Sequence, residues 1–292
     1  MKIPLDLVHT FDAIVSSGSL DSAATRLHIT ASAVSQRLKA LETQVGRVLL
    51  VRSKPVQPTP AGQAVLRLAR QLHAVEQDAL AALGIAAGGP AEVPLAVNAD
   101  SLATWFLPAL APLAGEIAFD LYRDDQDYTA GLLESGTVTA AVTSQARAVA
   151  GCTVRPLGAM RYLATASPKF MATWFADGIT PAAVARATLV DLDRRPDMQS
   201  RFLAALGVGV ESPPRHRVPA SNDFTTAVLL GMGWALIPEH QATAAIAEGR
   251  LIALGGPPMD VQLHWQRWKL ESSLLTRIET AIVGRARAVL RQ

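Results

Sequence analysis

Hydroxyl, amide and cationic side chains recur along one side of a helix pattern in residues 20–46. A short helix pattern over 22–27 is followed by a break at 28–30 and a second helix pattern over 31–45. Side chains of these types can hydrogen-bond base edges and phosphates, and two short helices joined by a tight turn are typical of a helix-turn-helix. A solvated amphipathic helix would show the same spacing, so the spacing alone leaves both interpretations open. The apolar positions of the second helix recur at i, i+4, i+7 and i+11 and are Val34, Leu38, Leu41 and Val45.

The segment that follows favours the helix-turn-helix. Residues 48–52 and 56–59 can form two strands of a hairpin, with residues 53–55 as the turn and Arg52 and Lys54 at the tip. A basic hairpin directly after such a helix is a wing, placed to lie on the phosphate backbone beside the groove.

The first sixty or so residues resemble the LysR-type transcriptional regulators. The chain departs from the family pattern at Leu50, where a bulky phenylalanine is more usual, and in the short tip of the wing. The resemblance rests on Phe11, Ser19, Leu20, Ala23, Ala24, Leu27, Ser32, Val34, Ser35, Leu38, Leu41, Glu42, Gly46, Leu49, Leu50, Arg52, Thr59, Pro60, Ala61 and Gly62. The residues that we predict to contact DNA are Ser22, Ala31, Ser32, Ala33, Ser35, Gln36, Arg37, Lys39, Arg52 and Lys54.

A long helix is predicted after the wing, from Pro60 to about Gly84. Its apolar positions alternate spacings of three and four, which makes a seam that needs a partner helix. The resemblance implies that the partner is a second copy of the chain, whereas packing within one chain is the alternative. The predicted seam consists of Val65, Leu68, Leu72, Val75, Ala79 and Ala82.

Residues 91–292 alternate short apolar strands with helices, which argues for an α/β domain with a parallel sheet. We expect Ser101 to cap a helix running to about Ala114, and Ser272 or Ser273 to cap the last helix. The resemblance implies a two-lobed effector domain like a type 2 periplasmic binding protein. We therefore predict a winged helix-turn-helix at 1–59, a linker helix and hinge at 60–90, and an effector domain at 91–292. Its lobes would be 91–161 with 265–292, and 162–264.

Polar residues follow several predicted strands of this domain, where an open α/β sheet binds ligands. Each group could equally be an ordinary helix cap. So many acids around one predicted cleft suit a ligand with a carboxylate and excess positive charge, such as a basic amino acid. The predicted effector residues are Asp100, Ser101, Leu102, Trp105, Asp124, Asp125, Thr143, Asn222 and Asp223.

Each of these residues has an expected partner on the ligand. The carboxylate would meet the N–H groups near Ser101 and Leu102. The α-ammonium would meet Asp223 or Asn222, and a distal ammonium the pair Asp124 and Asp125. Trp105 would wall the pocket or pack in the core.

Three segments of this domain resemble the lysine- and arginine-responsive branch of the same regulators, namely residues 99–110, 124–129 and 221–242. This likeness implies L-lysine as effector, with arginine or histidine as alternatives. It also implies control of genes for basic amino-acid export or transport.

Composition limits the other classes. No apolar run is long enough to span a bilayer, and the N-terminus does not read as a signal peptide. The single cysteine, Cys152, excludes an internal disulfide and is expected to be buried and inert. Residues 1–58 hold seven basic and four acidic side chains, a net charge of +3 against +2 for all 292 residues, which fits nucleic-acid binding. The histidines show no metal-ligand spacing, and no catalytic motif is present.

The prediction is a cytoplasmic, homo-oligomeric transcriptional regulator without enzyme activity, metal or cofactor. Its expected partners are double-stranded DNA and a second copy of the chain, with RNA polymerase as a further candidate and no membrane. One alternative keeps the regulator and changes the effector, for example to an aromatic acid. Another is a ligand-binding protein whose N-terminal module contacts protein. Salt-dependent DNA affinity separates the second alternative from the regulator.

Overall fold

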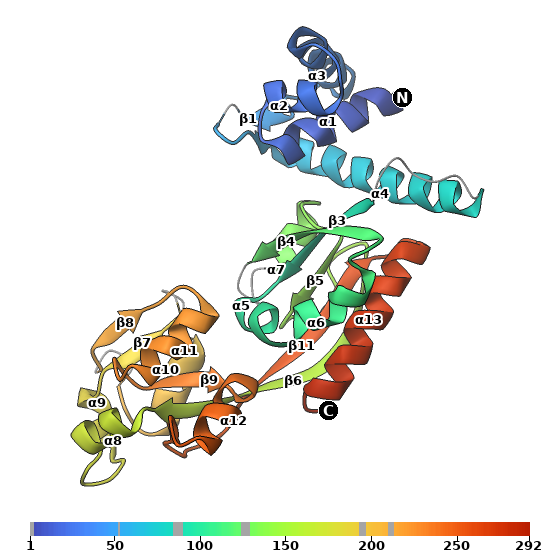
Figure 1. Cartoon of the computed structure of the whole chain (residues 1–292). Helices are drawn as coiled ribbons and strands as arrows, with labels where there is room; N and C mark the ends of the chain where they lie inside the picture. The colour runs from blue at the N-terminus through green and yellow to red at the C-terminus, as the bar shows by residue number, and fades with distance from the viewer. Residues whose placement is uncertain (1–2, 52, 84–89, 124–128, 193–196, 210–212) are drawn as a thin grey trace. The chain divides into compact units, whose positions relative to one another are not determined.

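A computed structural model describes residues 3–51, 53–83, 90–123, 129–192, 197–209 and 213–292 (Figure 1). Its contacts divide the chain into two compact units. The first consists of Met1–Val97, Pro112–Arg155 and Trp265–Thr280. The second consists of Asn98–Ala111, Pro156–His264 and Ala281–Gln292. Among the described residues, no helix is both long and apolar enough to cross a membrane.

The N-terminal part of the first unit begins with three helices, α1 (Leu5–Ser17), α2 (Leu20–Arg26) and α3 (Ala31–Val45). Side-chain caps explain where α2 and α3 begin, because the Ser19 and Thr30 hydroxyls accept hydrogen bonds from the amides of Ser22 and Ala33, both at 3.1 Å. The predicted helix-turn-helix is thus confirmed, with α2 starting two residues earlier than expected. Its core is fully buried at Val8, Phe11, Ile14, Ala23, Val34 and Leu41.

The predicted hairpin is present but short. Strands β1 (Leu50–Val51) and β2 (Gln57–Pro58) pair antiparallel, with Leu50 opposite Pro58. The Glu42 carboxylate accepts a hydrogen bond from the Leu49 amide at 2.8 Å, which fastens the hairpin to α3. A Cβ on Gly62 would lie 2.1 Å from the Leu49 carbonyl oxygen. The hairpin can therefore pack this closely against α4 (Pro60–Ala82) only because residue 62 has no side chain.

The rest of the first unit is built on a parallel sheet core. Strand β3 (Ala91–Val97) lies between β4 (Ile117–Arg123) and β5 (Ala140–Thr143) and runs parallel to both. Five successive residues of β3, 93–97, are buried, as expected for a strand covered on both faces. Helix α7 (Thr129–Glu134) leads into β5, and the end of β11 (Met259–Trp268) lies beside β5. Helix α13 (Ser273–Val289) follows β11, and the Ser272 hydroxyl caps it by accepting from the Leu275 amide, as predicted.

The second unit shows where the expectation of a parallel sheet was wrong. Strand β6 (Cys152–Ala166) pairs antiparallel with both β9 (Ala235–Pro238) and β10 (Ile252–Ala253). Strands β7 (Leu189–Asp191) and β8 (Arg215–Arg217), in contrast, run parallel. Between β6 and β11 lie the helices α8 (Pro168–Trp174), α9 (Pro181–Arg186), α10 (Asp197–Ala205), α11 (Ser221–Leu229) and α12 (Glu239–Ala247).

The helix expected after β3 is also different. It is divided into α5 (Ala99–Ser101), a π-helical turn η1 (Leu102–Phe106), α6 (Leu107–Leu110) and a 3-10 turn η2 (Ala111–Leu113). Its N-cap position is Asn98, so Ser101 lies inside the helix and does not cap it. A π-helical turn in a helix is frequently found at a functional site.

Candidate nucleic-acid interface and effector site

The outer face of α3 presents the side chains predicted to contact DNA. Ser32, Ser35, Gln36 and Lys39 are exposed, whereas Val34 and Leu41 are fully buried on the opposite side. Ala31 is also exposed, Ala33 is half-buried, and Ser22 on α2 is exposed with its hydroxyl bonded to that of Ser19 at 2.8 Å. The segment therefore offers donors and acceptors to solvent along one helix face.

Arg37 is placed differently from its neighbours. Its side chain is half-buried, and Nη1 donates a hydrogen bond to the Thr10 hydroxyl of α1 at 3.2 Å. The Thr10 hydroxyl in turn donates to the Asp6 carbonyl at 2.7 Å. Arg37 thus joins α3 to α1.

The wing carries one described cation, because Lys54 is exposed while Arg52 lies outside the described residues. On α4, Leu68 and Val75 are exposed, Leu72 is half-buried and Ala79 and Ala82 are exposed. Val65, in contrast, is buried in the core that it shares with α1 and α3. Five residues of the predicted seam thus remain accessible along α4, namely Leu68, Leu72, Val75, Ala79 and Ala82.

Among the described acids predicted for the effector, Asp100 is half-buried whereas Asp223 is exposed. Its Oδ2 accepts a hydrogen bond from the Tyr162 hydroxyl and its Oδ1 accepts one from the Ser221 hydroxyl, both at 2.7 Å. Burial raises the pKa of the Asp100 carboxyl, and the two hydroxyl bonds oppose that rise. Gln241 of α12 supports the arrangement, since its Nε2 donates to the Ser221 hydroxyl at 3.1 Å.

Three polar atoms close to Asp100 in sequence are buried without a hydrogen-bond partner in the described chain. They are Asn98 Oδ1, the Ser101 hydroxyl oxygen and Trp105 Nε1. Their side chains are at most 1% exposed. Buried polar groups are nearly always satisfied, so three such atoms within eight residues suggest that something else satisfies them.

The other residues predicted to bind the effector differ in their burial and hydrogen bonds. The Leu102 amide was expected to bind the ligand carboxylate. It instead donates to the Asn98 carbonyl at 3.0 Å, within the helix. Asn222 and Asp223 are exposed on α11, and Asn222 Oδ1 accepts from Gln241 Nε2 at 3.3 Å. Thr143 is buried in the first unit and accepts from the Gln145 amide at 3.1 Å. Asp124 and Asp125 lie outside the described residues.

The contacts of Asp100 could be foreseen only in part. Ser221 opens a polar segment that follows a strand, which gave a signal, whereas nothing in the sequence links Tyr162 or Gln241 to residue 100. Cys152 is half-buried, not buried as expected. Its partial burial raises the pKa of the thiol to about 11, which keeps the thiol protonated. No cluster of metal-binding side chains was found in the described ranges.

Two family models match the chain. One is the bacterial regulatory helix-turn-helix protein of the lysR family, at residues 5–63, and the other is the LysR substrate binding domain, at residues 89–282. The chain belongs to the LysR family. It is therefore a DNA-binding transcriptional regulator, as its sequence predicted, and not an enzyme.

Within the LysR family the chain is similar to regulators named for lysine and arginine. It is 42% identical over 280 residues to the HTH-type transcriptional regulator LysG of Mycobacterium tuberculosis, covering 96% of this chain and 92% of that protein. It is 39% identical over 287 residues to the lysine export transcriptional regulatory protein LysG of Corynebacterium glutamicum, covering 95% and 96%.

Solved structures of regulators named for lysine and arginine are also similar to the chain. The crystal structure of ArgP from Mycobacterium tuberculosis matches with a TM-score of 0.87 at 40% identity, over 99% of both chains. Full-length LysG from Corynebacterium glutamicum with bound effector Arg matches with a TM-score of 0.75 at 35% identity, over 99% of this chain and 100% of that one.

Proposed function

We propose that this LysR-family regulator binds a basic amino acid, L-lysine first, with arginine and histidine as further candidates. The protein would act in the cytoplasm. The gene that it controls would serve amino-acid export or transport. The similarity to LysG, whose structure holds arginine and whose name in one relative refers to lysine export, supports the ligand class. The observation that carries the proposal is the Asp100 carboxylate close in sequence to two buried donors without partners, the Ser101 hydroxyl and Trp105 Nε1.

The ligand would be held by opposite charges at its two ends. Asp100 would pair with an ammonium group, because a buried carboxylate gains most from a cation that also hydrogen-bonds it. The Ser101 hydroxyl and Trp105 Nε1 are donors without partners and would take the carboxylate. Asp124 and Asp125 remain the proposed partners of a distal ammonium. Asp223 or Asn222 remains a proposed partner of the α-ammonium, and Thr143 remains a proposed effector residue.

The DNA site that we propose is the exposed face of α3 together with the wing. Gln36 and the serines of α3 would reach base edges, and Lys39 and Lys54 the phosphates. The seam of α4 would join two copies of the chain, so that two half-sites are bound together. RNA polymerase is a further candidate partner.

Calorimetry with matched ligands and variants tests the effector. L-Norleucine is lysine without its distal ammonium, so the parent protein is expected to bind lysine and not norleucine. Asp100→Asn is expected to lose roughly thirty-fold or more in lysine affinity, because leaving a buried ammonium unpaired costs about 2–5 kcal/mol. Glu248→Gln, at an exposed acid outside the proposed site, is the control and is expected to keep the parent affinity.

Two outcomes would contradict this proposal. If the parent protein bound an aromatic acid and not lysine, arginine or histidine, the regulator would stand and the ligand class would fall. If lysine bound the Asp100→Asn protein as tightly as the parent, the site would lie elsewhere.

A further inference from the structure

Helix α4 carries a second face in addition to its apolar seam. Each helical residue advances about 100° around the axis, so Arg70 lies roughly 200° from Leu68 and faces away from the seam. Arg67, Ala74, Gln77 and Asp78 share the side of Arg70. Three of these residues, Arg67, Arg70 and Asp78, contact other elements of the first unit and are called the docked face of α4. The seam residues from Leu68 onward stay accessible.

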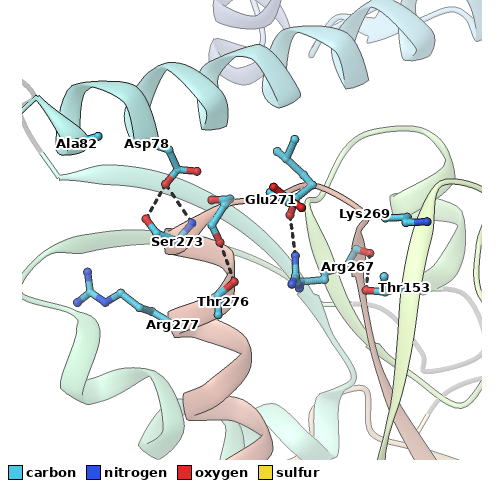
Figure 2. A pocket seen from close by; sticks show the side chains of 11 residues that line it. Asp78, Ala82, Thr153, Arg267, Lys269, Glu271, Ser273, Thr276 and Arg277 are labelled. Carbon is cyan, nitrogen blue, oxygen red and sulfur yellow. Dashed lines mark hydrogen bonds between the residues drawn. The ribbon is translucent and has the colours of Figure 1, made fainter.

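Two contacts fix the docked face. Asp78 Oδ1 accepts hydrogen bonds from both the amide and the hydroxyl of Ser273, at 3.1 and 2.6 Å, and so caps α13 (Figure 2). A Cβ on Gly136 would lie 2.9 Å from backbone atoms of Arg67, so the turn between α7 and β5 meets α4 at a residue that must lack a side chain. Gly136 also has a φ of +75°, which favours glycine.

Arg70 stands between these elements and the DNA-binding helices. Its side chain is only 9% exposed. Nη1 donates to the Gly136 carbonyl at 2.9 Å, and Nε lies 3.4 Å from Asp12 Oδ1 on α1. One guanidinium therefore bonds both the effector domain and the helix-turn-helix. A buried charge that loses a partner is strongly disfavoured. Movement of the Gly136 carbonyl or of Asp12 is therefore expected to shift the Arg70 side chain and, with it, the other partner.

The Gly136 turn also lies between predicted effector residues. Helix α7 starts directly after residues 124–128, which include Asp124 and Asp125, and β5 ends at Thr143. The turn is held to α7 by two backbone bonds, from Gly136 to the Leu133 carbonyl and from Val138 to the Leu132 carbonyl. A shift of α7 on ligand binding would thus displace the Gly136 carbonyl that Arg70 binds.

We propose that Arg70 is a positioning residue that couples effector binding to DNA binding, through Gly136 on one side and Asp12 on the other. This inference rests on the proposed effector site but adds a route by which its occupancy reaches α1. Coupling between two sites requires an element that both can bias, and the docked face of α4 is that element.

The test compares operator affinity with and without lysine, in the parent and in Arg70→Gln. Coupling of this kind is typically about 5- to 150-fold. In Arg70→Gln we expect the ratio of the two operator affinities to collapse toward one, while lysine affinity of the free protein stays within about two-fold. A purely structural role for Arg70 would lower both operator affinities and leave their ratio. Arg26→Gln is the matched control, because it breaks an exposed pair with Glu92 at 2.8 Å and should keep the parent ratio.

An unchanged ratio in a folded Arg70→Gln protein would overturn the proposal. If that protein does not fold, Asp12→Asn replaces it, since it removes only the charge at the α1 end, and the same collapse is expected and the same unchanged ratio overturns it. If the parent binds no lysine, the proposed effector fails, but the coupling is still tested by hydrogen exchange without ligand. Exchange that is faster in the variant than in the parent, in both α1 and the Gly136 turn, supports the coupling. Faster exchange confined to α4 overturns it.

Discussion

At the scale of single residues, Asp100 predicts how effector binding depends on pH. Burial raises the pKa of this carboxyl, so it takes up a proton at a higher pH than an exposed aspartate would. An ammonium pairs with the ionised form, and lysine affinity is therefore expected to fall as the pH is lowered through that raised pKa. Calorimetry over a series of falling pH would show this in the parent, with the loss of affinity beginning at a higher pH than an exposed aspartate would give. A pH dependence that persisted unchanged in Asp100→Asn would assign the effect to another group.

A second prediction at this scale separates two adjacent residues of α3. Gln36 is exposed, whereas Arg37 is half-buried and donates to Thr10. Gln36→Ala is expected to cost about 1–3 kcal/mol at one base position and to relax the preference there. Arg37→Ala is expected to lower the free energy of unfolding by about 1 kcal/mol, through the lost hydrogen bond, and to weaken binding to all sequences alike. Gel shifts on a set of single-base operator variants measure the DNA binding of both variants, and denaturant unfolding measures the stability of Arg37→Ala. An unchanged base preference in Gln36→Ala would mean that α3 does not read bases in the groove.

At the scale of elements, the wing depends on a glycine in the neighbouring helix. A Cβ at residue 62 would lie 2.1 Å from the Leu49 carbonyl oxygen, so Gly62→Ala must push the hairpin away from α4. We expect a lower melting temperature and weaker binding to every DNA sequence, because the wing contacts phosphates and not bases. Gly46→Ala has open space around its Cβ but a φ of +72°, so it controls for backbone strain without the steric clash. Equal DNA affinity in Gly62→Ala and the parent would mean that the wing does not take part.

The seam of α4 gives the prediction for assembly. Leu72→Arg would place an unpaired charge between two apolar seams, where it is strongly disfavoured. Analytical ultracentrifugation is expected to show a shift toward monomer, with loss of high-affinity operator binding because two half-sites are no longer engaged together. Leu107→Arg, at a leucine 50% exposed in the second unit, is the control. Parent-like sedimentation of Leu72→Arg would leave α4 with its intrachain role alone.

What the sequence could predict at this scale follows from the range of the interactions. Helices α2, α3 and α13 are set by local caps at Ser19, Thr30 and Ser272, which can be read from neighbouring residues. The full length of β6 could not be read, because its pairing with β9 and β10 joins segments far apart in the chain. The contacts of Asp100 with Ser221 and of Arg70 with Gly136 are likewise long-range, and local patterns carry no information about them. Val65 is a further example. Its apolar position predicted that it lies in the seam, whereas in the folded protein it is buried in the core.

At the scale of the whole molecule, a regulator of this kind works only if ligand occupancy changes DNA affinity. The helix-turn-helix supplies the DNA face, the residues around Asp100 supply the proposed effector site, and Arg70 is the proposed link between them. Each part can be present without the response, so the response itself is the central claim.

The most direct measurement is a fluorescence-anisotropy titration of the full chain on a DNA duplex selected for tight binding from a random pool. It is run with L-lysine, with L-norleucine and with no amino acid. Lysine is expected to shift the midpoint by about five-fold or more, in either direction, whereas norleucine is expected to leave it in place. Identical midpoints in all three titrations, with lysine shown by calorimetry to be bound, would contradict it.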